Sequence, residues 1–527
     1  MMRGLLLASV FAGLAATALP SPAQAQGTVT VAMTAGDLPI TTGVPDQGFE
    51  GNRFVGLSLY DALTGWDLTH SDRAAVLKPM LATSWEIDPA NNKRWIFHLR
   101  QGVKFHDGCD FTADDVVWNL NRYTNKDAEG FDTFQFALAR AYLTSFAGVS
   151  KIDDHTVAIE TKTPDSLFPY PLSLINLISR CRAASLKFDW NAYATHPSGT
   201  GPYRFVASVP RERMELEPNK EYWDAARRPK QDRLVLIPMP EASTRVAALI
   251  SGQVNFIEAP PPDSLPRLKS AGMMTITNSY PHNWAYQLNF VNGPFKDVRV
   301  RRAANYALNR ADMKDMLGGL MEEGYSTVPP ATPYFGNPVL YKYDADKATA
   351  LLKEAGCYPC AITLAISTSG SGQMQPLPMN ELVKSQLEAV GFKVDLNVMD
   401  WNALLDVGRQ GIDKFPKIDG INISRAAPDP FYALIRHVGR SQWAPAGGNW
   451  GHYEDAETES LISAVSNEFD DTKRLELLKK LNERMNDQAV MIWVAHDVNP
   501  RTLSPKLHGF VQAQSWFQDL TPITVSP

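Results

Sequence analysis

Segments with the two-residue alternation of β-strands and segments with the spacing of amphipathic helices follow one another along the whole chain. Residues 94–100 alternate apolar and polar side chains. Residues 112–123 begin at Thr112, a favourable N-cap, and continue with apolar side chains at helical spacing. Helix and strand patterns also adjoin at 241–256 and at 379–401. Because helices and strands interleave, the sequence predicts the α/β fold class.

The length of the chain predicts more than one domain. Its 527 residues exceed what a single hydrophobic core usually supports, so we expect two or three domains. Neither a repeat of fixed period nor a low-complexity linker separates one part of the chain from another. We therefore expect domains that are connected by several crossings of the chain.

The N-terminus has the pattern of an export signal. One arginine precedes an apolar run at 5–19, and Ala23-Gln24-Ala25 offers a small-x-small cleavage site. The alternative, a membrane anchor, is disfavoured because the run is shorter than the roughly 20 residues of a bilayer-spanning helix. We predict a signal peptide at 1–25, cleavage after Ala25 and a periplasmic protein without a lipid anchor, since no cysteine follows the cleavage site.

The composition and the dispersed reactive residues argue against several functions. The net charge of −6 and the lack of a Lys/Arg-rich run give no reason to expect a nucleic acid or an anionic membrane as partner. The chain has no G-x-S-x-G, H-E-x-x-H or S-x-x-K motif, and its ten histidines are scattered. We therefore predict no catalytic residue, metal site or cofactor. A carboxylate pair for glycoside hydrolysis stays open, because its separation depends on the fold.

The four cysteines are expected to be structural in an oxidising compartment. Cys357 and Cys360 have the spacing of a redox dithiol, but they follow the end of a predicted helix, where the helix dipole does not lower a thiol pKa. We predict that these two form a loop disulfide. Whether Cys109 pairs with Cys181 is left open.

The stretch 95–122, "WIFHLRQGVKFHDGCDFTADDVVWNLNR", resembles the family-5 solute-binding proteins of ABC importers, the dipeptide- and oligopeptide-binding group. Further resemblances follow in the expected order: "PMLATSWEIDP", "SGTGPYRF", "TRVAALISGQVNF", "LNFVNGPFKDVRVRRAANYALNR", "YKYDADKATALLKEAG" and "NDQAVMIWVAHDVNPRTLSPKLHGF". The resemblance implies a bilobed periplasmic-binding-protein-like fold of class II. It has three subdomains, a ligand cleft between the lobes, a two-segment hinge and no catalytic activity.

The resemblance also implies a division of the chain. The first lobe would combine 26–54, 199–291 and 494–527, with 55–198 as its inserted subdomain. The second lobe would be 292–493. The two hinge crossings would lie near "LNFVNG" and "MIWVAHD".

Ligand residues are expected mainly in the second lobe. By resemblance, Trp401 would line the pocket as a stacking wall, although core packing is an equal alternative. In peptide binders of this family an acidic residue grips the α-amino group of the peptide, and Ser424 stands at that position, followed by Arg425. An arginine would suit an anionic or polyhydroxylated ligand. Asp429 could replace the missing acid, but helix capping is its expected role.

Three further residues are candidates for ligand contact. Trp284 and Tyr286 precede the expected hinge and would face the cleft. Asp37 lies in the Gly/Pro-rich segment 35–54, at the end of the first predicted strand, where ligand loops sit in open α/β sheets. Its default role is that of a solvated loop residue.

The sequence thus predicts a monomeric solute-binding protein that captures a small polar solute, peptide or peptide-like, and delivers it to an inner-membrane ABC permease. An opine, an oligosaccharide or a metal chelate are alternative ligands for the same fold. A secreted hydrolase and a sensor-type or chaperone-like binder are the alternatives from other classes.

Overall fold

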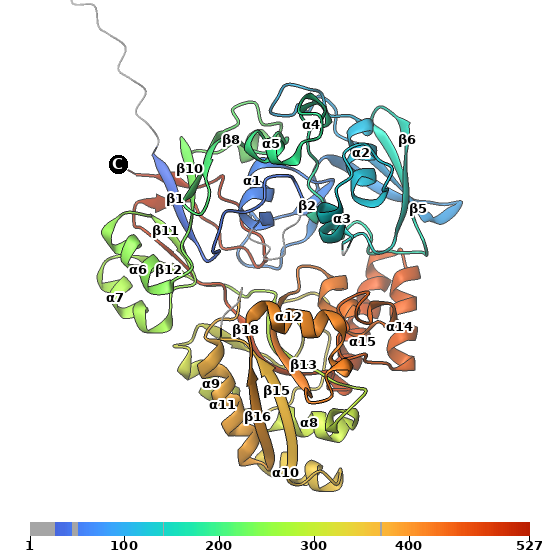
Figure 1. Ribbon diagram of the computed structural model, residues 1–527, viewed down its shortest axis with the longest axis vertical. Helices are drawn as coiled ribbons and strands as arrows, with labels where there is room; N and C mark the ends of the chain where they lie inside the picture. The colour runs from blue at the N-terminus through green and yellow to red at the C-terminus, as the bar shows by residue number, and fades with distance from the viewer. Residues whose placement is uncertain (1–26, 45–50, 141, 369–371, 527) are drawn as a thin grey trace, which may run out of the picture.

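The computed structural model describes residues 27–44, 51–140, 142–368 and 372–526. The predicted signal peptide at 1–25 lies outside these ranges. The upper lobe in Figure 1 is built around a seven-stranded and a four-stranded sheet, and the lower lobe around a six-stranded sheet. This arrangement confirms the expected bilobed α/β fold.

The seven-stranded sheet has the order β12-β19-β11-β1-β10-β9-β8 and collects distant parts of the chain. Its strands are β1 (Thr28–Met33), β8 (Tyr203–Val209), β9 (Arg213–Pro218), β10 (Arg233–Pro238), β11 (Phe256–Glu258), β12 (Met274–Ile276) and β19 (Arg501–Leu503). β1 lies in the centre and pairs in parallel with β10 and β11. Helices α6 (Ala242–Ser251) and α7 (Leu265–Ser270) connect β10 to β11 and β11 to β12.

The four-stranded antiparallel sheet belongs to the segment between β1 and β8. Its order is β4 (Ala82–Asp88), β5 (Asn91–Leu99), β7 (Thr156–Thr161) and β6 (Phe146–Asp153). The same segment contains α1 (Leu57–Leu59), β2 (Thr64–Trp66), β3 (Leu77–Pro79), α2 (Ala113–Thr124), α3 (Thr133–Ala139), α4 (Arg180–Ser185) and α5 (Trp190–Thr195). A disulfide joins Cys109, just before α2, to Cys181 in α4.

The six-stranded sheet has the order β14-β18-β13-β17-β15-β16. Its strands are β13 (His282–Leu288), β14 (Met321–Glu323), β15 (Cys360–Ile366), β16 (Phe392–Val398), β17 (Gly420–Ala426) and β18 (Met491–Asp497). The helices of this lobe are α8 (Val298–Tyr306), α9 (Arg310–Met316), α10 (Ala345–Glu354), α11 (Pro376–Ala389), α12 (Trp401–Gln410), α13 (Arg436–Val438), α14 (Ala456–Asn467) and α15 (Asp471–Asp487). A second disulfide joins Cys357 to Cys360 at the start of β15.

The chain passes between the two large sheets at 277–281, after β12, and at 498–500, after β18. The sequence analysis placed the first crossing near "LNFVNG" at 288–293, but it lies before this stretch. β13 pairs with β17 and β18, so a lobe boundary after Val291 separates β13 from its own sheet. A boundary before Val494 likewise divides β18. The alternation of a strand does not reveal the sheet in which it pairs, because pairing is a long-range property.

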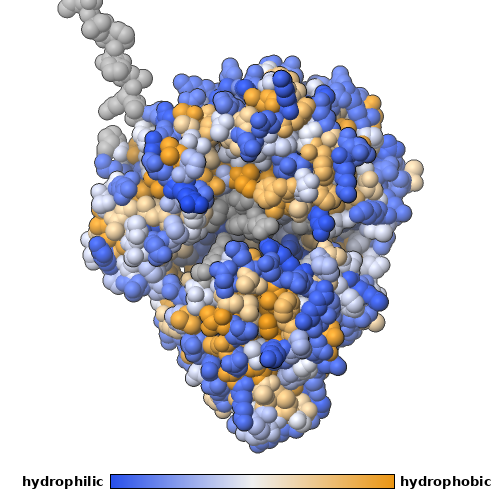
Figure 2. All heavy atoms as spheres, in the orientation of Figure 1, coloured by the Kyte–Doolittle hydropathy of each residue, from blue (hydrophilic) through white to orange (hydrophobic). Residues whose placement is uncertain are grey.

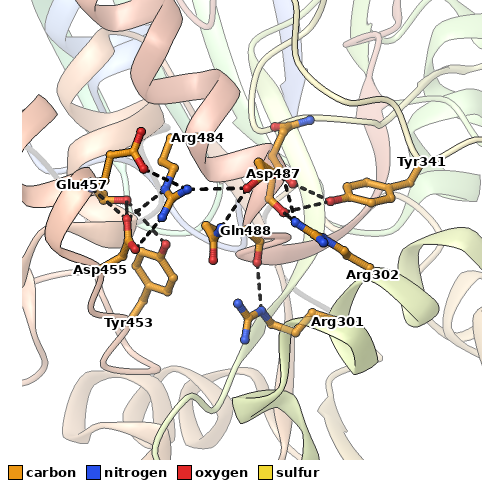
Figure 3. A network of polar contacts seen from close by, with 11 residues as sticks. Arg301, Arg302, Tyr341, Tyr453, Asp455, Glu457, Arg484, Asp487 and Gln488 are labelled. Atoms are coloured by element: carbon orange, nitrogen blue, oxygen red, sulfur yellow. Dashed lines mark hydrogen bonds and ion pairs between the residues drawn. The ribbon is translucent and has the colours of Figure 1, made fainter. Parts of the chain in front are cut away.

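A polar network fastens α14 and α15 to α8 in the second lobe (Figure 3). Arg484 contacts Asp455 at 2.7 Å and Glu457 at 3.0 Å. Asp487, near the end of α15, accepts a hydrogen bond of 2.9 Å from Arg302 of α8. The side chains of three helical segments are thus connected away from the cleft. None of the described helices has both the length and the apolar composition needed to cross a membrane.

Candidate ligand-binding cleft

A cavity of about 520 Å³ lies between the two lobes, where Figure 2 shows the surface hollowed. The upper wall includes Arg53, Glu258, Arg501 and Trp516. Residues at or next to the crossings are Tyr280, His282, Asp497 and Asn499. The lower wall includes Trp401, Leu405, Arg409, Ser424, Arg425, Arg436, His437 and Trp450. Of the residues predicted for the ligand site, the cavity brings together Trp401, Ser424 and Arg425.

Helix α12 presents one face to this cavity. Asp400 caps the helix, because its Oδ1 atom accepts a 2.8 Å hydrogen bond from the backbone N–H of Asn402. Trp401, Leu405 and Arg409 then follow at intervals of four residues, so they lie on the same side of the helix. The cap and the helical period together place an aromatic and a cationic side chain on the lower wall.

Arg425 is held in β17 and lies against an aromatic ring. Its Cζ atom lies 3.8 Å from the ring centroid of Trp450. Its Nε and Nη2 atoms are buried and have no hydrogen-bond partner among the described residues. Burial lowers the pKa of Arg425, and the positive charges of Arg436 and Arg409 lower it further. An anion placed here would gain charge-assisted hydrogen bonds and would stabilise the charged guanidinium.

The upper wall contains a buried carboxylate between two arginines. Glu258 Oε1 lies 2.7 Å from Arg53 Nη1 and 2.8 Å from Arg501 Nη2. Burial raises the pKa of Glu258, but Arg501 and Arg53 overcome this effect and lower it. Arg53 also donates a 3.1 Å hydrogen bond to the hydroxyl of Tyr280. Glu258 is therefore an ionised structural partner of the upper wall.

The cleft contains a serine, a histidine and an aspartate in the sequence of contacts that a hydrolytic triad has: Ser424 lies next to His282, and His282 lies next to Asp497. The Oγ atom of Ser424 lies 3.5 Å from Nε2 of His282, and Nδ1 of His282 lies 4.0 Å from Oδ2 of Asp497. The second distance is too long for the hydrogen bond that orients a catalytic histidine. Burial lowers the pKa of His282 to about 3, with smaller contributions from Arg53 and His496. These groups therefore give no support to the hydrolase alternative.

Comparison with known proteins decides the family. The model of the bacterial extracellular solute-binding proteins, family 5, matches residues 76–442. The chain belongs to this family. Its members are solute-binding proteins and not enzymes, and they are periplasmic. The predicted function as a solute-binding protein is thus confirmed.

Curated relatives of this solute-binding protein cover most of its length. A glutathione-binding protein of Pectobacterium atrosepticum is 28% identical over 516 residues, which are 95% of each chain. A dipeptide-binding protein of Escherichia coli is 28% identical over 459 residues, covering 82% of this chain and 83% of the relative. An ABC transporter-associated periplasmic binding protein from Helicobacter pylori, solved in complex with peptide STSA, has a TM-score of 0.78 at 22% identity. That match covers 95% of this chain and 98% of the solved one.

Two predicted ligand residues of the solute-binding protein lie in its core instead of the cleft. Trp284 and Tyr286 are both fully buried, and neither lines the cavity. The indole N–H of Trp284 donates to Gln373 at 3.0 Å, and the hydroxyl of Tyr286 donates to Asn380. The reason is that β13 is an interior strand between β17 and β18: its first residue, His282, reaches the cleft, whereas Trp284 and Tyr286 pack into the core of the second lobe.

Asp37 and Asp429 also lie outside the described lining of the cleft. The Oδ1 atom of Asp37 accepts a 2.9 Å hydrogen bond from the backbone N–H of Arg211, in an exposed loop of the first lobe. The Oδ1 atom of Asp429 accepts a 2.9 Å hydrogen bond from the backbone N–H of Tyr432. This contact caps the following helical segment, which was the role expected from the sequence.

Several lining residues were missed by the sequence analysis. Arg409 could have been found, because it lies two helical turns after Trp401. Trp450, Arg436 and Arg53 carry no local signal, since they reach the cavity only through the fold.

Proposed function

We propose that this solute-binding protein captures a peptide or peptide-like solute with a net negative charge in the cleft and delivers it to an inner-membrane ABC permease. Relatives named for binding dipeptides and glutathione support the peptide character of the ligand. A structural neighbour that is associated with an ABC transporter supports the delivery step.

The position of Arg425 carries the proposal of negative charge. Its buried Nε and Nη2 atoms have no partner among the described residues, so a ligand carboxylate would supply the missing acceptors. Among the described residues that line the cleft, there are six arginines and two carboxylates. One of these carboxylates, Glu258, already contacts Arg53 and Arg501. The described lining therefore favours an anionic ligand over a cationic one.

Ser424 also favours an anionic ligand, because it offers no negative charge to the amino group of a peptide. The resemblance to peptide binders implies an acid at this position, where it would grip a free α-amino group. Ser424 lies in the cleft but offers only a hydroxyl. A simple dipeptide would thus gain little from its ammonium group, whereas an additional carboxylate would meet the arginines.

Calorimetric titration of the mature protein with glutathione and with Ala-Ala tests the proposal. Glutathione has two carboxylates and one ammonium group, whereas Ala-Ala has one of each. We expect glutathione to bind at least tenfold more tightly. Equal affinities, or tighter binding of Ala-Ala, would contradict the proposed selection for negative charge.

The cleavage site of the signal peptide and the oligomeric state can be tested on protein purified from the native host. We propose that the mature chain begins at Gln26 and is a monomer in the periplasm. N-terminal sequencing of the periplasmic fraction should read Gln-Gly-Thr-Val, and light scattering should give the mass of a single mature chain. A different N-terminus or a larger mass would correct these two points.

A further inference from the structure

A second cavity of about 560 Å³ lies between the inserted segment of the first lobe and the second lobe. The turn after β17 separates it from the cleft, because Ala426 lines the cleft whereas 427–430 line the second cavity. The function proposed above does not involve this space.

Aromatic side chains from both lobes form the walls of the second cavity. They are Trp66, Trp85, Trp95, Tyr170, Tyr334 and Phe469. Trp95 and Phe469 contact each other across the two lobes, with ring centroids 5.8 Å apart. The hydroxyl of Ser166 donates a 2.7 Å hydrogen bond to the carbonyl of Val465, which fixes the two walls relative to each other. The cavity thus has mainly aromatic walls, which come from both lobes and are joined by a hydrogen bond.

Two buried acceptor atoms in the lining lack donors. Asp429 is 1% exposed, and its Oδ2 atom has no hydrogen-bond partner among the described residues. The Oε1 atom of Gln514 is buried and also has no partner there, while its Nε2 atom donates to the carbonyl of Ser71 at 3.3 Å. A buried acceptor without a donor costs free energy. A ligand with N–H donors would therefore be stabilised by hydrogen bonds to these two atoms.

The charges around the second cavity differ from those of the cleft. Its described lining includes Asp429, Asp471 and Glu86 but a single cation, Arg474, which forms an ion pair with Asp471. Burial raises the pKa of Asp429 to about 7, although the backbone N–H groups of Tyr432 and Phe431 and, more weakly, the positive charge of Arg436 act to lower it. A cation in the cavity would therefore stabilise the carboxylate.

We propose that the second cavity is a ligand site for a protonated primary amine with an apolar or aromatic body. The ammonium group would donate a hydrogen bond to Asp429, with Gln514 as a further acceptor in the same lining, and the aromatic walls would attract its charge through their ring faces. The apolar body would replace water along the same walls. A volume of this size is in the range of small-molecule pockets.

Calorimetric titration with phenethylammonium chloride and with its neutral analogue 2-phenylethanol tests this proposal on the mature protein. We expect the amine to bind at least tenfold more tightly than the alcohol. Asp429→Asn removes the charge but keeps an acceptor for the cap on Tyr432, and it should weaken amine binding at least tenfold. The matched control Asp110→Asn changes an exposed carboxylate outside the cavity and should leave amine binding within twofold.

Two further variants keep the test decisive. Ala75→Trp adds a large ring to the lining and leaves the residue at position 429 unchanged, and it should abolish amine binding even if Asp429→Asn folds poorly. Trp401→Ala alters the cleft, and loss of amine binding in this variant would place the amine there and overturn the proposal. Equal binding of amine and alcohol, or undiminished binding by folded Asp429→Asn or Ala75→Trp, would also overturn it.

Discussion

The guanidinium group of Arg425 lies over the indole ring of Trp450, with 3.8 Å between its Cζ atom and the ring centroid. The same indole packs against α12 where Gly408 has no side chain. A Cβ atom at Gly408 would lie only 2.1 Å from the ring of Trp450. The orientation of the cation in the cleft therefore depends on a ring whose position depends on a glycine.

Replacing Arg425 should weaken the binding of an anionic ligand. Arg425→Ala removes charge-assisted hydrogen bonds and should cost roughly 1.5–3 kcal/mol, or about ten- to a hundredfold in affinity. Arg425→Lys should recover little if the arginine contact is bidentate, because an ammonium group cannot reproduce two parallel hydrogen bonds. Calorimetry with glutathione measures both variants. Unchanged affinity in Arg425→Ala would show that the ligand binds elsewhere in the cleft.

Gly408→Ala should reduce the affinity for glutathione, although residue 408 does not line the cleft. The added methyl group forces the ring of Trp450 to move, and Arg425 loses its stacking partner. We expect a loss of about tenfold in glutathione affinity, together with a lower melting temperature. As a matched control, Gly102→Ala would change a glycine whose Cβ meets no atom within 4 Å, although its φ of +73° costs some stability. Equal affinities of both variants would contradict the dependence on Trp450.

Local signals in the sequence were sufficient for many of the elements. Thr112 donates its backbone N–H to Asp115 at 3.0 Å, and α2 begins at the next residue, as predicted. At α10 the capping bond has the opposite direction, because the side chain of Asp344 accepts from the backbone N–H of Lys347. Gly252 ends α6 with a φ of 79°. Caps and helical period act within a few residues, so a single sequence reveals them.

The arrangement of the site depends on contacts that no local signal carries. The residues of β13 do not themselves indicate which side chains face the core, and only its pairing with β17 and β18 shows that Trp284 does. The second cavity draws its walls from segments near residues 66–95, 166–170, 329–334, 427–430 and 469–478. No spacing in the sequence indicates that these segments meet.

Replacing two different tryptophans should distinguish a side chain that contacts the ligand from one that packs in the core. Trp401 is partly exposed on the lower wall of the cleft, and Trp284 is fully buried. Trp401→Ala should weaken glutathione binding and change the free energy of unfolding little. Trp284→Ala should lower the free energy of unfolding by roughly 3–5 kcal/mol, because it leaves a large cavity in the core. Chemical denaturation and calorimetry on both variants check this; the reverse pattern would contradict the placement of the two side chains.

The two disulfides should differ in their contribution to stability. Cys109–Cys181 spans 72 positions, whereas Cys357–Cys360 spans three. In the chain-entropy model a longer loop loses more freedom in the unfolded state, so the first bond should contribute about 4 kcal/mol and the second clearly less. Urea denaturation of the two double Cys→Ser variants measures the difference. A larger loss for the Cys357/Cys360 variant would contradict the entropic explanation.

The stability of the second lobe should depend on pH through Asp455. The hydrogen bonds and positive charge of Arg484 help to hold the pKa of Asp455 at about 2, below its usual value of 3.8. A carboxyl group whose pKa is lower in the folded state stabilises the fold when it is ionised. Its contribution is therefore fully present above about pH 4 and is lost as the pH falls towards 2. The difference between the two pKa values corresponds to about 2 kcal/mol.

Asp455→Asn isolates this contribution. Asparagine keeps an acceptor for the backbone N–H of Thr458, which Asp455 caps at 2.9 Å, but it cannot ionise. The variant should be less stable than the wild type at pH 6 by about 2 kcal/mol, and this difference should shrink as the pH approaches 2. Urea denaturation at pH 6, 4 and 2.5 measures the free energy of unfolding of both proteins. A difference that stays constant across this range would show that Asp455 acts through its cap and not through its charge.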